Sequence, residues 1–127
     1  MKHKQREKGQ SFLEFALILP VLLIILAGVL DLGRLYFSYV TVTDAAAEGA
    51  AYAAIHPGDG SEVEERALDS SNITADEGTV IFESSGDTVT VTVNYSFTLA
   101  TPVLNSLVPD GYIPLEAVAS EVILSNN

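Results

Sequence analysis

The sequence predicts an α+β protein, in which one long N-terminal helix packs on a small antiparallel sheet. Three observations predict this class. An apolar run occupies residues 15–30, an alanine-rich helical pattern continues from it to Ile55, and apolar and polar residues alternate strictly over residues 88–99. The first two patterns repeat every three to four residues or are continuously apolar, which indicates helix, whereas a period of two indicates a strand.

The apolar run is long enough to cross a membrane. From Phe15 to Leu30 every residue is apolar, small or proline. At about 1.5 Å per residue, this run and its flanks match a hydrocarbon layer roughly 30 Å thick. The run exceeds the apolar part of a secretory signal peptide, about 7–15 residues, and no clean small-x-small cleavage site follows it. We therefore expect a retained anchor, in which Pro20 is tolerated.

The charges on the two sides of this run differ in sign. Four of the six basic residues precede it, namely Lys2, Lys4, Arg6 and Lys8. After Arg34 there are fourteen acidic residues against the single basic Arg66. Basic flanks stay on the cytoplasmic side, so we expect a single pass through the cell (inner) membrane with the N-terminus cytoplasmic and the C-terminal domain extracytoplasmic. Membrane lipid is then one partner, and an acidic body is a poor ligand for nucleic acid.

The long helix is expected to continue beyond the membrane. We place it from about Ser11 to about Ile55, where His56-Pro57-Gly58 ends it. Eight of residues 45–54 have small side chains that let another element approach closely, and they are called the alanine band below: Ala45, Ala46, Ala47, Gly49, Ala50, Ala51, Ala53 and Ala54. We expect this band to pack within the molecule; a face for another subunit is the alternative. Asp31 and Arg34 are expected to mark the outer membrane boundary and to pair weakly.

The rest of the chain predicts a small head. Ser61 is the expected cap of a short helix that ends near Ser70. A pair of strands is then expected to form an antiparallel hairpin. A loop that contains proline and glycine follows, with room for one helical turn. A last strand ends the head, although its residues 116–119 are also compatible with helix. The expected strands are 79–83, 88–99 and 115–124. The predicted divisions are a basic leader (1–9), a transmembrane half (10–34) and an extracytoplasmic half (35–56) of the helix, and the head (57–127).

Glu14 is the one ionisable residue within residues 9–30. A carboxylate that stays charged at the centre of a bilayer costs on the order of 2.5–3.5 kcal/mol, so such a residue is a functional-site hypothesis. The alternative is an anchor at the membrane surface with its carboxylate in water. His3 and His56 are expected at the surface.

The segment Lys8-Gly9-Gln10-Ser11-Phe12-Leu13-Glu14-Phe15 resembles the processing site of type IV pilin-like proteins. Together with Asp31-Leu32-Gly33-Arg34 and the alanine band, it is similar to the TadE-like family, minor pseudopilins of the Flp (Tad, tight-adherence) pilus. The resemblance implies a pilin-like fold and a cut between Gly9 and Gln10 by a prepilin peptidase. Glu14 would then be fifth and Phe15 sixth in the mature chain. Members of the family often carry arginine where this chain has Ala47 and Ala51, so contacts of those arginines do not carry over.

Two functions of different classes remain open at this point. The first, which the resemblance implies, is a processed structural or assembly subunit of a Flp (Tad) pilus or related secretion system, with other pseudopilins or pilins and the Tad assembly platform as partners. The second is an unprocessed single-pass membrane-anchored extracytoplasmic binding module. No pattern indicates an enzyme or a cofactor site, and the absence of cysteine excludes disulfides and thiolate metal sites. The acids Asp59, Glu62, Glu64 and Glu65 raise a calcium hypothesis, but without EF-hand spacing they are more typical of a solvated helix start.

Overall fold

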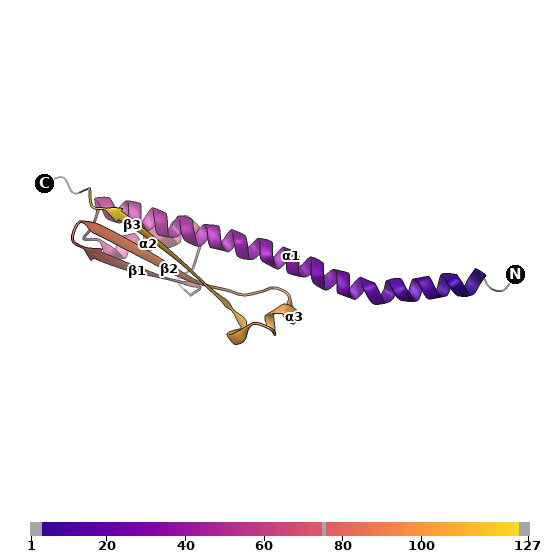
Figure 1. Cartoon of the computed structure of the whole chain (residues 1–127). Helices are drawn as coiled ribbons and strands as arrows, with labels where there is room; N and C mark the ends of the chain where they lie inside the picture. The colour runs from indigo at the N-terminus through magenta and orange to yellow at the C-terminus, as the bar shows by residue number, and fades with distance from the viewer. Residues whose placement is uncertain (1–3, 75, 125–127) are drawn as a thin grey trace.

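One long helix carries a small head on its C-terminal half (Figure 1). The structure is a computed structural model and describes residues 4–74 and 76–124; the leader residues Lys2 and His3 lie outside this range. Helix α1 runs from Lys4 to Ile55 and contains Pro20 without ending there. It therefore starts earlier than the expected Ser11 and ends where predicted. The α+β class, with a long N-terminal apolar helix and an antiparallel sheet, is confirmed.

The head contains a second helix and three strands. Helix α2 spans Gly60–Ser71, and strands β1, β2 and β3 span Gly78–Ser85, Thr88–Phe97 and Ile113–Val122. The strands are antiparallel in the order β1-β2-β3. Between β2 and β3 lie the single helical turn α3 (Pro102–Asn105) and the short 3-10 turn η1 (Pro109–Gly111), so the predicted turn within this loop is confirmed.

The hairpin between β1 and β2 follows the predicted alternation. Ser85 pairs with Thr88 across a two-residue turn in which Gly86 has a φ of 60°, a conformation that glycine adopts without a steric penalty. Val89, Val91 and Val93 of β2 are fully buried, and the residues between them are partly exposed. The strand ends at Phe97, two residues before the expected Leu99.

The structure confirms the predicted last strand over its helical alternative and corrects the predicted cap of the short helix. The segment 116–119 is strand and not helix, because β3 pairs along its whole length with the central strand β2. Helix α2 begins at Gly60 with Asp59 as its N-cap, so Ser61 lies inside the first turn and does not cap it. The backbone carbonyl of Asp59 accepts hydrogen bonds from the amides of Glu62 and Val63, which starts the helix before Ser61 is reached.

The core lies between the alanine band, α2 and the inner face of the sheet. Buried residues come from all three layers: Val42, Ala45, Ala46, Ala50, Ala53 and Ala54 of α1, Val63 and Ala67 of α2, Ile73, Val80 of β1, and Val89, Val91 and Val93 of β2. A Cβ atom at Gly49 would lie 3.1 Å from Val91 and 3.2 Å from Ala67, so the helix is as close to its neighbours as small residues permit. The expectation that the band packs within the molecule is confirmed.

Two members of the alanine band are exposed, and these are the positions at which TadE-like proteins often carry arginine. Ala47 and Ala51 face away from the head, whereas Ala50 and Ala53 are fully buried. An arginine at either exposed position would therefore leave the core of the head undisturbed.

We predict that Ala50→Leu destabilises the head by about 1–3 kcal/mol, because the added methylenes have no space between α1 and the sheet. Ala47→Leu is the matched control, with the same chemical change on the exposed side of the same helix turn. Thermal or denaturant unfolding of the full chain in detergent measures both. Equal stability of the two variants would contradict this account of the core.

Candidate functional site

The residues of the predicted processing segment lie in the first turns of α1. Gly9, Gln10, Glu14 and Phe15 are all exposed. Apart from the adjacent backbone of α1, no described atom lies within 4 Å of the position that a Cβ atom would take at Gly9. The side-chain amide of Gln10 donates a hydrogen bond of 3.3 Å to Glu14 Oε1, one helical turn away. The Gly9–Gln10 bond is thus part of α1, and both this bond and Glu14 lie on an exposed part of the helix.

The next turns of α1 are apolar on every side, and their large side chains are exposed. Large side chains are exposed all around the helix: Phe12, Leu13, Phe15, Leu17, Ile18, Leu19, Val21, Leu22, Leu23, Ile24, Ile25 and Leu26. α1 is long and apolar enough to cross a membrane, and its most apolar stretch is not buried within the molecule. A helix that is apolar all round requires an apolar environment, so this part indicates membrane anchoring.

Asp31 connects this part of α1 to the head through hydrogen bonds with the loop after β2. Its side chain is 3% exposed, and its two carboxylate oxygens accept hydrogen bonds from the backbone amides of Ala100 (3.1 Å) and Thr101 (3.0 Å). The guanidinium of Arg34 donates to Asp31 Oδ1 at 3.2 Å. A carboxylate with three donors is satisfied without water, which permits its burial.

The predicted pairing of Asp31 with Arg34 is therefore confirmed, but the larger role of Asp31 was not expected. Its main partners lie about 70 residues further along the chain, and no sequence pattern connects them. The sequence offered one signal, because Asp31 is the first acidic residue after the apolar run. The helical period does not show which side of α1 this residue occupies. Only the approach of the loop after β2 shows what that carboxylate binds.

A second contact lies one turn closer to the N-terminus. A Cβ atom at Gly28 would lie 3.4 Å from Leu104 Cδ1, so the side chain of Leu104 in α3 rests against the bare backbone of α1. Arg34 lies on the other side of Asp31, 55% exposed, with its guanidinium carbon 5.5 Å from the centre of the Phe97 ring. Arg34 and Phe97 border an open groove of about 670 Å³ between α1 and the end of β2.

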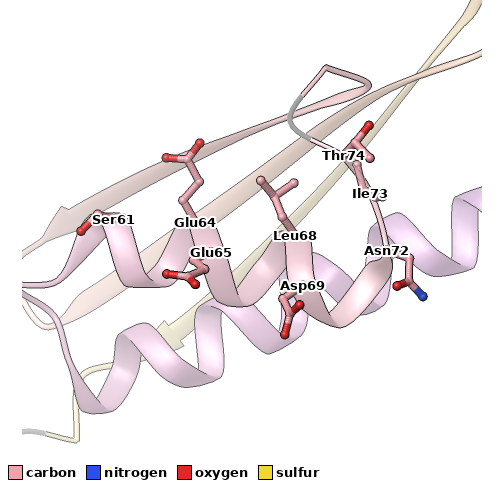
Figure 2. A pocket seen from close by; sticks show the side chains of 8 residues that line it. All are labelled: Ser61, Glu64, Glu65, Leu68, Asp69, Asn72, Ile73 and Thr74. Carbon is pink, nitrogen blue, oxygen red and sulfur yellow. The ribbon is translucent and has the colours of Figure 1, made fainter.

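The acidic residues of α2 border another open groove, which Figure 2 shows from close by. The Glu64 carboxylate points away from those of Glu65 and Asp69. Among the residues whose side chains are described, no group of three or more Asp, Glu or His could hold a metal ion together. Glu62 instead accepts a hydrogen bond from the Tyr52 hydroxyl, which raises the pKa of that phenol and links α1 to α2. His56 is exposed as expected and stacks on the Tyr52 ring, with 4.5 Å between the ring centres.

The processing segment, the bare apolar helix, the Asp31 anchor and the alanine band all lie on α1. A family model described as TadE-like protein matches residues 9–51. This part of α1 is therefore similar to the corresponding region of TadE-like proteins. The match starts at Gly9, includes Glu14, Asp31 and most of the alanine band, and ends before the head. No curated protein and no solved structure matches the chain significantly.

The TadE-like match confirms the resemblance seen in the sequence. The family implies a minor pilin-like protein associated with the Tad pilus, with other pilus components as partners and a structural rather than an enzymatic role. The cut after Gly9, the partner of Glu14 and the orientation in the membrane are finer assignments. Gly9 and Glu14 themselves are exposed.

We predict that Asp31→Ala accelerates hydrogen exchange at the amides of Ala100 and Thr101 by about tenfold or more, because each loses a charge-assisted hydrogen bond. Asp31→Asn keeps one acceptor oxygen and should show a smaller effect. NMR or mass-spectrometric exchange on the full chain in micelles measures this. Arg34→Gln is the control, because it removes the ion pair and the guanidinium over Phe97 but leaves the carboxylate in place. If it accelerates exchange as strongly as Asp31→Ala, the anchoring role of the carboxylate is wrong.

Proposed function

We propose that this protein is a membrane-anchored minor pseudopilin, which a prepilin peptidase processes after Gly9 and which then joins a Flp (Tad) type IV pilus or a related secretion system as a structural or assembly subunit. The observation that carries this proposal is the TadE-like match over residues 9–51. In the sequence, Glu14 follows Gly9 by five residues. The proposed orientation has the basic leader in the cytoplasm and the acidic head outside, in the cell (inner) membrane.

The geometry around Gly9 supports processing at this bond. The Gly9–Gln10 bond lies at the start of the apolar helix, where a membrane-embedded peptidase meets the chain at the cytoplasmic surface. Glycine inside a helix is less stable than alanine by about 0.5–1 kcal/mol, so the helix opens more easily here than elsewhere in the turn. The absence of a Cβ atom also leaves the backbone accessible for entry into a narrow active site.

Glu14 has a direct use once the leader is removed. Cutting creates an ammonium group on Gln10, and the Glu14 carboxylate of a neighbouring subunit can pair with it. In the chain with its leader, Glu14 accepts only the neutral amide of Gln10 among the contacts that the structure records. Attraction between opposite charges is much stronger at low dielectric, although desolvation offsets much of the gain. The pair would therefore set the register between subunits, while apolar helix packing supplies most of the affinity.

We predict that the protein isolated from membranes of its native cells begins at Gln10, and that Gly9→Leu blocks the cut and leaves the full-length chain. Gly33→Leu is the matched control, since Gly33 is also an exposed glycine of α1 with no atom within 4 Å of its Cβ position. Intact mass and N-terminal sequencing distinguish the two forms. A wild-type protein that keeps residues 1–9 would contradict the proposal and favour the unprocessed single-pass binding module.

We further predict that Glu14→Gln, although still inserted in the membrane, is recovered with other pilus subunits in strongly reduced amounts, because a neutral amide attracts a neighbour's ammonium only weakly. Glu48→Gln is the control, as it neutralises an exposed carboxylate on the same helix outside the apolar part. Cross-linking in membranes followed by mass spectrometry measures the association. Normal processing together with normal association of Glu14→Gln would refute the pairing role.

A further inference from the structure

We infer that the head contacts the membrane a second time, through residues 99–109, which lie in the outer lipid interface beside α1. This stretch, called the α3 segment below, connects β2 to the η1 turn and contains α3. The inference rests on the proposed function only in requiring that α1 crosses a bilayer.

The α3 segment runs back along α1 toward the N-terminus. It begins at the Asp31 carboxylate, which holds the amides of Ala100 and Thr101, and Leu104 then lies against Gly28, one turn earlier on α1. Figure 1 shows α3 at the end of the head that is nearest to the N-terminal part of α1. The segment is therefore the part of the head closest to the apolar helix turns.

The length of the apolar run places that contact at the membrane surface. Residues 15–30 extend over roughly 24 Å as a helix, and a start at Phe12 lengthens this to roughly 28 Å. The hydrocarbon layer is roughly 30 Å thick, so a membrane that covers the run reaches at least to Leu30. Gly28 then lies inside the outer edge of the bilayer, and Leu104 beside it lies at the same depth.

The composition of the α3 segment differs from that of the rest of the head. Residues 99–109 contain no charged side chain, whereas the chain after Arg34 has fourteen acidic residues. The segment nevertheless exposes large apolar groups: Leu107 is 75% exposed and Val103 53% exposed. Tyr112, whose amphipathic ring is typical of the membrane interface, follows it and is also exposed.

The backbone of the α3 segment is suited to an environment poor in water. The amides of Asn105, Ser106, Leu107 and Val108 all donate to carbonyls three or four residues earlier within the segment. Pro102 has no amide hydrogen, and Asp31 accepts those of Ala100 and Thr101. Six of the nine backbone amides in residues 99–109 are thus bonded, which lowers the cost of bringing the exposed apolar side chains into the lipid interface.

Lipid is the favoured occupant because the segment contacts α1 at Gly28, within its apolar run. Val29 and Leu30 are exposed next to Gly28, and Arg34 follows one turn later, at the depth where a guanidinium meets lipid headgroups. No basic residue lies in the segment, and Asp110 follows it, so the contact depends on apolar burial and does not require anionic lipid.

The chain contains no tryptophan, so a single introduced tryptophan reports its own depth. We compare Leu107→Trp with two controls in vesicles of phosphatidylcholine, with or without bromine on the acyl chains: Leu22→Trp within the apolar run, and Val118→Trp, 58% exposed on β3. Brominated lipid should quench Leu22→Trp and Leu107→Trp, whereas iodide in the buffer should quench Val118→Trp alone. Val103→Trp repeats the measurement within the same segment.

Each remaining outcome has a defined meaning. If iodide but not brominated lipid quenches Leu107→Trp and Val103→Trp while Leu22→Trp behaves as expected, the second contact is refuted and the membrane anchor stands. If Leu22→Trp itself escapes brominated lipid, the anchoring part of the proposed function fails. If Leu107→Trp is shielded from both quenchers, a second copy of the chain covers the segment and the lipid contact is refuted.

Discussion

The hydrogen bonds of Asp31 hold the architecture together where the long helix leaves the apolar region. A buried carboxylate requires full compensation, and it receives two backbone amides from the loop after β2 and the guanidinium of Arg34. Because amides point in fixed directions, these bonds determine both the distance of the loop from α1 and its rotational position. The position of Leu104 against Gly28 follows from this anchor.

Helix α1 serves two different environments along its length. From Phe12 to Leu26 it exposes large apolar side chains on all sides, which suits lipid and leaves no face for the head. Within the alanine band, by contrast, the buried face consists of alanine and Gly49, and the large side chains belong to the partner strand β2. Small residues thus bring the helix close to the sheet, and the bulk of the core is supplied by Val89, Val91 and Val93.

The TadE-like match follows the division between the long helix and the head. It covers α1 from Gly9 to Ala51 and none of the head. The residues proposed for processing and subunit contact, Gly9 and Glu14, lie at the opposite end of the helix from the head and do not touch it. A head of this kind can vary in sequence while the helix keeps its contacts, provided that it retains an inner face that fits the alanine band and a loop that reaches Asp31.

Much of the fold was predictable because its signals are local. The apolar run, the end of α1 at Ile55 and the alternation of β2 each depend on residues a few positions apart, so the sequence by itself determined one long helix and a hairpin. The same holds for Gly9 and Glu14, whose spacing is a local motif. The helical alternative for 116–119 and the cap at Ser61 failed because local propensity was overridden, by pairing with β2 in one case and by the Asp59 carbonyl in the other.

Only the tertiary structure decided the role of Asp31 and the position of residues 99–109. A contact across about 70 residues depends on how the sheet directs the chain back to α1, and no local pattern contains that information.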